Sequence, residues 1–184
     1  GVYSSNYHSR FDVFSHILEY PQRPIVDTRF TEYINSQDLP SGINAIVAIG
    51  CYSGYNQEDA LIINKSSVER GLFRSVYFRS YMDKEKDINI VEDKYNEEKT
   101  TYFMNPLEFS KENKVNFNGK KFDYLDENGF VKLNTYVTDK DIIIGKCIYE
   151  GKNSIGEENI VADGLRPKIG TSGIVDKVYV TEYE

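Results

Sequence analysis

The chain reads LPSGINAIVAIG at residues 39–50, and this stretch decides the fold that we predict. Its Leu-Pro-Ser-Gly start is typical of a turn, with Pro preset at the second position. Residues 43–49 are then almost continuously apolar over the length of a strand, which indicates a strand buried on both faces. A second apolar stretch at residues 60–63 follows a polar loop at residues 52–57. We therefore expect buried β structure in this region.

Shorter elements are predicted on either side of this stretch. Residues 9–20 carry apolar side chains at helical spacing, and the step into Pro21 should end that helix. Residues 66–69 have the Ser-x-x-Glu spacing of a helix capping box, and Gly71 suits the end of a single helical turn. Residues 72–81 alternate partly between apolar and basic side chains, which predicts a further strand.

The rest of the chain favours short strands separated by Asn, Gly and Asp. An Asn-Gly pair at residues 128–129 is a strong hairpin signal when strands flank it. A small sandwich or barrel is the expected shape of this part. The predicted strands are residues 102–103, 120–125, 130–137, 141–149 and 173–181.

Composition supports a mainly β fold with short helices, that is, a β-rich α+β class. The chain has 15 Tyr and 10 Phe but no Trp, and flat aromatic side chains suit a pleated, half-buried surface. Around residues 81–87 alternating charges replace apolar anchors, which marks either a domain boundary or an exposed excursion, and we place the boundary there. We accordingly divide the chain into residues 1–82 and residues 83–184.

Bulk properties exclude several classes of protein. The formal net charge is -7, whereas proteins that grip nucleic acid alone are usually basic. No apolar run approaches the roughly 20 residues of a membrane helix, so we expect no membrane partner. Cys51 and Cys147 fit neither a disulfide framework nor a C-x-x-C metal spacing, which favours reduced thiols in an intracellular protein. Because the chain starts without Met and ends in a strand-like run at residues 178–181, we expect an internal piece of a longer protein.

Two adjacent carboxylates, Glu58 and Asp59, are the candidate functional residues. They stand between a glycine-containing loop and the predicted strand at residues 60–63. Adjacent acids at a strand edge point to opposite sides, so one can face a cleft while the other addresses a metal ligand, a water or a basic neighbour. Carboxylate oxygens suit Mg²⁺, which often uses one or two of them beside substrate phosphates. From composition alone, the alternative is a pair of solvated loop acids.

The sequence around this pair identifies a family. The relevant strings are LPSGINAIVAI at residues 39–49, CYSGYNQEDA at residues 51–60 and IINKSSVERGLFRS at residues 62–75. Together they resemble the second-largest subunit of archaeal, nuclear and large-DNA-virus RNA polymerases, the counterpart of the bacterial β subunit. Strong resemblance covers residues 1 to about 87. Beyond it landmarks persist at residues 124–126, 129, 141–146 and 173–178.

The resemblance implies a role in a DNA-directed RNA polymerase, a nucleotidyltransferase. Residues 1–82 look like the hybrid-binding region, including strands of a double-psi β-barrel, and residues 83–184 look like the β-rich wall or flap. Glu58 and Asp59 correspond to the acidic pair that faces the second, nucleotide-borne Mg²⁺, with Asp59 facing the metal directly or through water and Glu58 in support. The first Mg²⁺ is held by an aspartate triad of the largest subunit, which completes a two-metal arrangement.

Partners and location follow from the same resemblance. The implied partners are the largest and other polymerase subunits, template DNA and the RNA-DNA hybrid in the assembled enzyme, and initiation factors at the wall or flap. The implied location is the nucleus or cytoplasm, or a cytoplasmic factory or virion if the protein is viral. Without the aspartate triad the isolated chain is expected to be inactive. The alternative function is a noncatalytic polymerase-derived β scaffold that binds transcription factors, and a third is an unrelated acidic interaction module.

Overall fold

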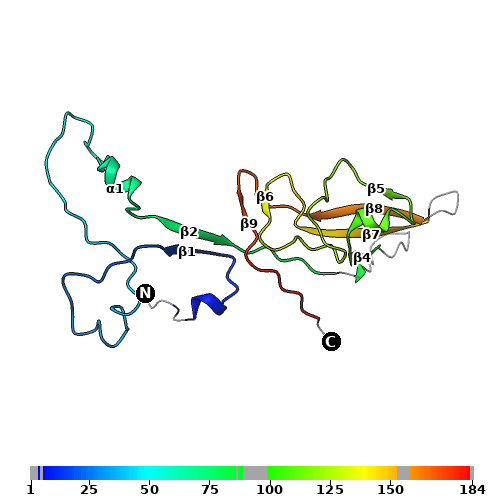
Figure 1. The fold of residues 1–184 in the computed structure, drawn as a ribbon, viewed down its shortest axis with the longest axis horizontal. Helices are drawn as coiled ribbons and strands as arrows, with labels where there is room; N and C mark the ends of the chain where they lie inside the picture. The colour runs from blue at the N-terminus through cyan, green and yellow to red at the C-terminus, as the bar shows by residue number, and fades with distance from the viewer. Residues whose placement is uncertain (1–3, 5, 86, 89–98, 153–157, 183–184) are drawn as a thin grey trace. The chain divides into compact units, whose positions relative to one another are not determined.

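The structure is a computed structural model that describes residue 4 and residues 6–85, 87–88, 99–152 and 158–182 (Figure 1). It divides into two compact units, Gly1–Ser80 and Tyr81–Glu184. The described residues are β-rich with a few short helices, which confirms the predicted mainly β class. Within the ranges given above, no helix combines the length and the apolar character needed to cross a membrane.

The first unit contains one small antiparallel sheet. Strand β1 (Phe14–Leu18) pairs along its whole length with β2 (Ser75–Arg79), and the two lie side by side in Figure 1. A 3-10 helix, η1 (Tyr7–Ser9), precedes β1, and α1 (Lys65–Glu69) precedes β2. The strand predicted at residues 72–81 is therefore confirmed over its central part.

Helix α1 confirms the predicted helical turn but uses a different cap. The Asn64 side chain accepts a hydrogen bond from the Ser67 N–H at 2.9 Å, so Asn64 rather than Ser66 satisfies the helix start. At the other end the Leu72 N–H donates to the Ser67 carbonyl at 3.0 Å. Gly71 has a φ of 103°, which suits glycine at a helix end because it has no Cβ.

The helix predicted over residues 9–20 is wrong. Its second half contains β1, whose partner β2 is about sixty residues away in the sequence, and residues 9–20 contain no α-helix. Local apolar spacing carries no information about so distant a partner, and pairing with it overrides the weak local helical preference.

The strands predicted at residues 43–49 and 60–63 are also wrong. The structure assigns neither segment to a strand, and Ile46 and Ile49 are fully exposed instead of buried. A strand needs a neighbour for its N–H and C=O groups. The adjoining backbone forms a single bridge, Gln22 with Gly42. Residues 43–49 pair with no strand, and the Asn44 N–H donates instead to the Gln22 side-chain oxygen at 2.9 Å.

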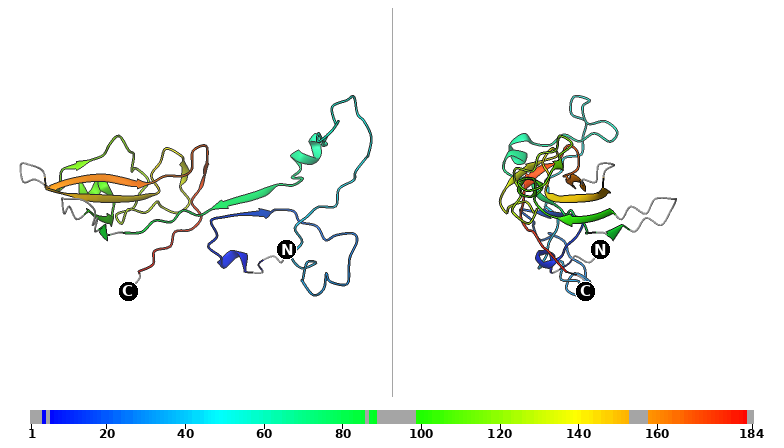
Figure 2. Two further views of the ribbon diagram at one scale, coloured as in Figure 1. Left: turned by 180° about the vertical axis from the view of Figure 1, so that it is seen from behind. Right: turned by 90° about the vertical axis from the view of Figure 1, so that its right-hand side faces the viewer.

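The second unit is built on a five-stranded sheet with the order β3-β4-β7-β8-β5. At its centre, β7 (Ile144–Lys152) pairs antiparallel with β8 (Glu158–Leu165), and Figure 2 shows them side by side from two further directions. Strand β4 (Lys99–Phe103) pairs antiparallel with β7, and β3 (Asp87–Ile88) extends that edge. On the opposite edge, β5 (Val115–Asn116) pairs parallel with β8.

Smaller elements complete this unit. Helix α2 (Pro106–Phe109) follows β4, and β6 (Tyr136–Thr138) forms a separate antiparallel pair with β9 (Ser172–Ile174). The hairpin predicted at the Asn-Gly pair is present as a turn closed by the Asp126 N–H bond to the Phe130 carbonyl at 2.7 Å. Four predicted strands overlap β4, β6, β7 and β9. The strand predicted at residues 120–125 is wrong, because this segment meets partners only at isolated bridges of Lys121 and Leu125. Strands β3, β5 and β8 were not predicted.

The hydrophobic core of the described residues lies in the second unit. Two small residues, Gly145 on β7 and Gly164 on β8, face each other in the sheet register. A Cβ on Gly164 would lie 2.4 Å from the Ile142 Cγ2 atom, so glycine allows the preceding loop to pack directly on the sheet. The buried cluster consists of Phe122, Leu125, Val131, Val137, Ile142, Ile143 and Ala162.

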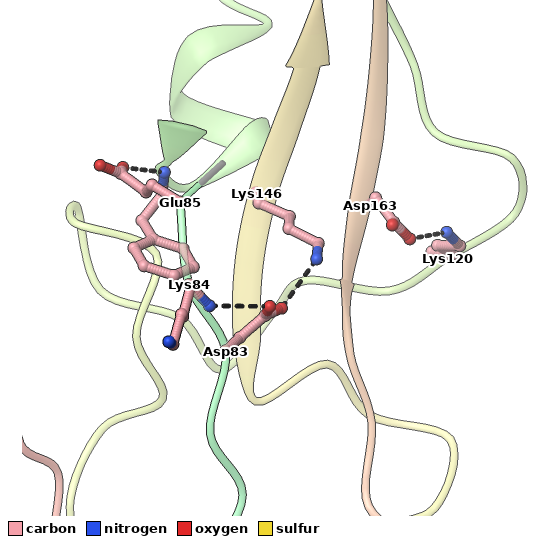
Figure 3. Close-up of polar contacts among 7 residues, drawn as sticks. Asp83, Lys84, Glu85, Lys120, Lys146 and Asp163 are labelled. Carbon is pink, nitrogen blue, oxygen red and sulfur yellow. Dashed lines mark hydrogen bonds and ion pairs between the residues drawn. The ribbon is translucent and has the colours of Figure 1, made fainter. Parts of the chain in front are cut away.

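Charged side chains fasten the start of the second unit to its sheet. The Asp83 carboxylate accepts hydrogen bonds from Lys146 Nζ on β7 at 2.7 Å and from the Lys84 N–H at 2.9 Å (Figure 3). Two residues on, a Glu85 oxygen accepts a hydrogen bond from the Phe103 N–H at 2.6 Å. These contacts hold residues 83–85 against β4 and β7.

A second ion pair extends this charged network across β8. Asp163 lies opposite Lys146 in the β7–β8 register and pairs with Lys120 (Figure 3). Burial acts to raise the pKa of the Asp163 carboxyl, but the hydrogen bonds from Lys120 and the Gly164 N–H outweigh it, together with the charges of Lys120 and Lys146. The pKa of Asp163 therefore lies below its ordinary value, and its carboxylate stays charged.

Replacing Lys146 by Met is expected to lower the free energy of unfolding by about 1–3 kcal/mol, because it leaves the Asp83 carboxylate without its cation. Both side chains are only 18% exposed. Urea unfolding followed by tyrosine fluorescence measures the change. Lys111→Met is the matched control, since the Lys111–Glu108 side chains are 68% and 50% exposed and should contribute less than about 1 kcal/mol. Equal losses for the two variants would contradict the importance of the half-buried pair.

The two free thiols should differ in reactivity. Cys51 is exposed, whereas Cys147 on β7 is buried, and this burial raises the pKa of its thiol to about 11. Because the thiolate is the reactive form, iodoacetamide at about pH 8 should modify Cys51 in the native protein and Cys147 only after unfolding. Mass spectrometry with and without urea checks this result. Modification of both thiols in the native protein would show that Cys147 is accessible.

Candidate functional site

The acidic pair belongs to a loop of the first unit that is built from two successive turns. In the first turn the Tyr55 N–H donates to the Tyr52 carbonyl at 3.1 Å. Its central residues, Ser53 and Gly54, have φ values of 54° and 73°. Positive φ at both central positions is the pattern of a type I′ turn, which glycine favours. The loop therefore reverses sharply before it reaches the acids.

The second turn carries the two carboxylates. The Ala60 N–H donates to the Gln57 carbonyl at 3.2 Å, so Glu58 and Asp59 occupy the two central positions, and both are exposed. This replaces the predicted strand edge with a tight turn. Glu58 has a φ of 55°, a conformation that costs a residue with a Cβ roughly 1–2 kcal/mol. Strained backbone of this kind is concentrated at functional sites in proteins.

A third residue, Asn56, connects the two turns. Its Oδ1 accepts a hydrogen bond from the Tyr52 N–H at 2.8 Å, and its Nδ2 donates to the Gly50 carbonyl at 2.6 Å. Asn56 is also the only residue between positions 44 and 66 that is not exposed. The sequence motif alone assigned it no role. Its position directly after a glycine-containing turn was a usable signal, since Asn side chains commonly bond to nearby backbone.

The chemistry of the pair fits part of a Mg²⁺ site. Glu58 and Asp59 offer carboxylate oxygens, the hard ligands that Mg²⁺ prefers, and both are open to solvent. In the part of the chain that the structure describes, no three His, Cys, Asp or Glu side chains gather where they could hold a metal ion. The pair can therefore contribute to a site that is completed by phosphate, water or ligands from other chains.

Comparisons with known proteins agree on one family. The family model for RNA polymerase Rpb2, domain 6, matches residues 1–184. The chain is 41% identical over 187 residues to the DNA-directed RNA polymerase II subunit RPB2 of Eremothecium gossypii, with 98% of the chain and 14% of the relative covered.

Two further relatives extend this similarity across kingdoms. Identity is 42% over 189 residues to the DNA-directed RNA polymerase II subunit 2 of Arabidopsis thaliana, with 98% of the chain and 15% of the relative covered. It is 38% over 188 residues to the DNA-directed RNA polymerase subunit Rpo2 of Sulfolobus acidocaldarius, with 99% and 16% covered. The chain thus spans about one seventh of the length of these relatives.

Proposed function

The chain belongs to the RNA polymerase Rpb2, domain 6, family, and from this premise we propose that Glu58 and Asp59 bind the nucleotide-borne Mg²⁺ during templated RNA synthesis. The observation that carries the proposal is the exposed, strained turn that presents both carboxylates. The polymerase activity of an assembled enzyme that contains this chain is part of the same proposal.

The two acids have different roles in this proposal. Asp59 faces the metal, directly or through water, and Glu58 supports it. When bound, the ion supplies positive charge that stabilises the triphosphate as pyrophosphate leaves. The chain's own contribution is to hold negative charge in a fixed place, so that little rearrangement is needed when the nucleotide arrives. The other Mg²⁺ belongs to the aspartate triad of the largest subunit, and the isolated chain is expected to be inactive.

The proposed partners are further polymerase subunits and nucleic acid. Residues 1–82 act as the hybrid-binding region beside template DNA and the RNA-DNA hybrid, and residues 83–184 act as a wall or flap that meets initiation factors. Exposed apolar side chains at residues 46, 47 and 49 support packing of the first unit against more protein. Because the net charge of -7 disfavours binding of nucleic acid by this chain alone, the proposed contact is one made within the assembled enzyme. The location would be the nucleus, the cytoplasm or a viral factory.

Iron-directed cleavage tests whether the turn approaches the nucleotide-borne metal. In polymerase reconstituted with the full-length subunit, Fe²⁺ replaces Mg²⁺ and reduces added hydrogen peroxide to hydroxyl radicals that cut nearby backbone, while ascorbate regenerates Fe²⁺. We expect cuts within residues 52–60 that appear on addition of a nucleoside triphosphate and disappear with excess Mg²⁺. Nucleotide-dependent cuts confined to other segments would refute the proposed placement.

A further inference from the structure

We infer that Asn56 is a positioning residue for the acidic pair: its side-chain amide ties the start of the loop to the turn that presents Glu58 and Asp59. The inference rests on the proposed function, since it concerns how the two carboxylates are aimed at Mg²⁺. It assigns Asn56 no contact with the metal, the nucleotide or the reacting atoms.

The hydrogen bonds of the Asn56 side chain link two parts of the loop. Both ends of the amide reach back along the chain, Oδ1 to the Tyr52 N–H at 2.8 Å and Nδ2 to the Gly50 carbonyl at 2.6 Å. Asn56 itself sits between the turn of residues 52–55 and the turn of residues 57–60. A single side chain therefore couples the entry of the loop to the residue just before the acidic turn.

Packing cannot supply the same order. Every other residue between positions 44 and 66 is exposed, so few side-chain contacts hold this loop in the described structure. The backbone is also strained, because Ser53 and Glu58 have positive φ values of 54° and 55°. Such conformations persist only where surrounding interactions determine them. The two hydrogen bonds of the Asn56 side chain are interactions of that kind.

Asparagine suits this position because it offers a donor and an acceptor on one short, rigid group. Alanine removes both hydrogen bonds. Serine keeps a polar side chain but is too short to bridge Gly50 and Tyr52. Comparing the two substitutions therefore separates the effect of bridging from the effect of a polar side chain. Neither substitution changes the Glu58 and Asp59 side chains themselves.

The test uses polymerase reconstituted with the full-length subunit. Asn56→Ala is expected to raise the Mg²⁺ concentration for half-maximal nucleotide addition about tenfold, as for the loss of a residue that orients a metal ligand. The rate at saturating Mg²⁺ should largely recover, because the carboxylates remain. Hydrogen exchange, measured by mass spectrometry on peptides covering residues 50–57, should become faster. Asn56→Ser should behave like Asn56→Ala, and wild-type behaviour of Asn56→Ser would overturn the bridging role.

Asn64→Ala is the matched control. It removes a side-chain hydrogen bond of similar length, the 2.9 Å bond from the Ser67 N–H that caps α1. Exchange should become faster around α1, while the Mg²⁺ requirement should change by less than about twofold, in keeping with independent sites. An equal increase in the Mg²⁺ requirement for Asn64→Ala would show that general loosening of the unit, and not the loss of the two Asn56 hydrogen bonds, causes the increase.

Combination with Asp59→Asn separates failure of the inference from failure of the proposed function. In the Asp59→Asn variant, adding Asn56→Ala should raise the Mg²⁺ requirement by less than about twofold more, because the effects of residues that act through one group are not additive. If Asp59→Asn alone leaves the Mg²⁺ requirement unchanged, the proposed function fails. If Asp59→Asn raises it but Asn56→Ala does not, despite faster exchange at residues 50–57, the positioning role alone is wrong.

Discussion

Polymerase that carries Asp59→Asn is expected to add nucleotides at least about a hundredfold more slowly than the wild type, because loss of a preorganised electrostatic group costs on the order of 10²–10³ in rate. The amide has nearly the same size as the carboxylate but lacks its negative charge. Assembly should be unchanged, since Asp59 is exposed on a turn. Single-turnover extension of RNA on a preformed RNA-DNA scaffold measures the rate, and size-exclusion chromatography measures assembly.

Glu69→Gln is the control for this prediction. Glu69 is also an exposed acid of the first unit, and its Oε1 atom lies 3.8 Å from Lys65 Nζ on α1. Its neutralisation should leave the rate of nucleotide addition unchanged. Glu58→Gln should give a smaller loss than Asp59→Asn if Glu58 has a supporting role. Normal extension by assembled Asp59→Asn polymerase would favour the noncatalytic scaffold over the metal-binding role.

Phe122→Ala is expected to lower the free energy of unfolding of the second unit by about 3–5 kcal/mol. The Phe122 side chain is 1% exposed and lies in the core cluster with Ile142 and Ala162. Its ring also meets Phe117 edge-on at a centroid distance of 6.0 Å. Alanine leaves a cavity and removes this contact. Since whole domains are stable by about 5–15 kcal/mol, the loss is a large share of the total.

Urea unfolding followed by near-ultraviolet circular dichroism measures this loss. Tyr124→Ala is a matched control because it removes an aromatic ring two residues away. The Tyr124 side chain is 43% exposed, so we expect a loss of about 1 kcal/mol or less. A similar midpoint shift for both variants would mean that Phe122 does not belong to the core in solution.

The elements predicted from sequence are those whose signals are local. Helix α1 has its capping side chain and its terminal glycine within a few residues, and β7 begins at the end of a run of three isoleucines at residues 142–144. Strand β8 has neither signal, since Asp163 and Gly164 interrupt its apolar residues. Its conformation comes from pairing with β7, which places Asp163 opposite Lys146 and Gly164 opposite Gly145. Such cross-strand partners cannot be read from a local pattern.

The candidate site likewise has features that the sequence predicts and features that only the structure shows. The identity of Glu58 and Asp59 came from a motif, and the comparisons place that motif in the Rpb2 family. The positive φ of Glu58 and the hydrogen bonds of Asn56 are properties of three-dimensional loop closure, which residue spacing does not encode. For residues 43–49 the apolar pattern indicates that a neighbour is required, but it does not say whether the same chain supplies it.

The exposed apolar segment at residues 43–49 also has a consequence for the life of the protein in a cell. Unpaired, β-prone segments of this kind aggregate and are captured by chaperones and proteases. Copies produced in excess of the partners proposed above should therefore be short-lived, whereas copies in which such a partner covers the segment should persist. Balanced synthesis of the partners would then control how much of this protein accumulates.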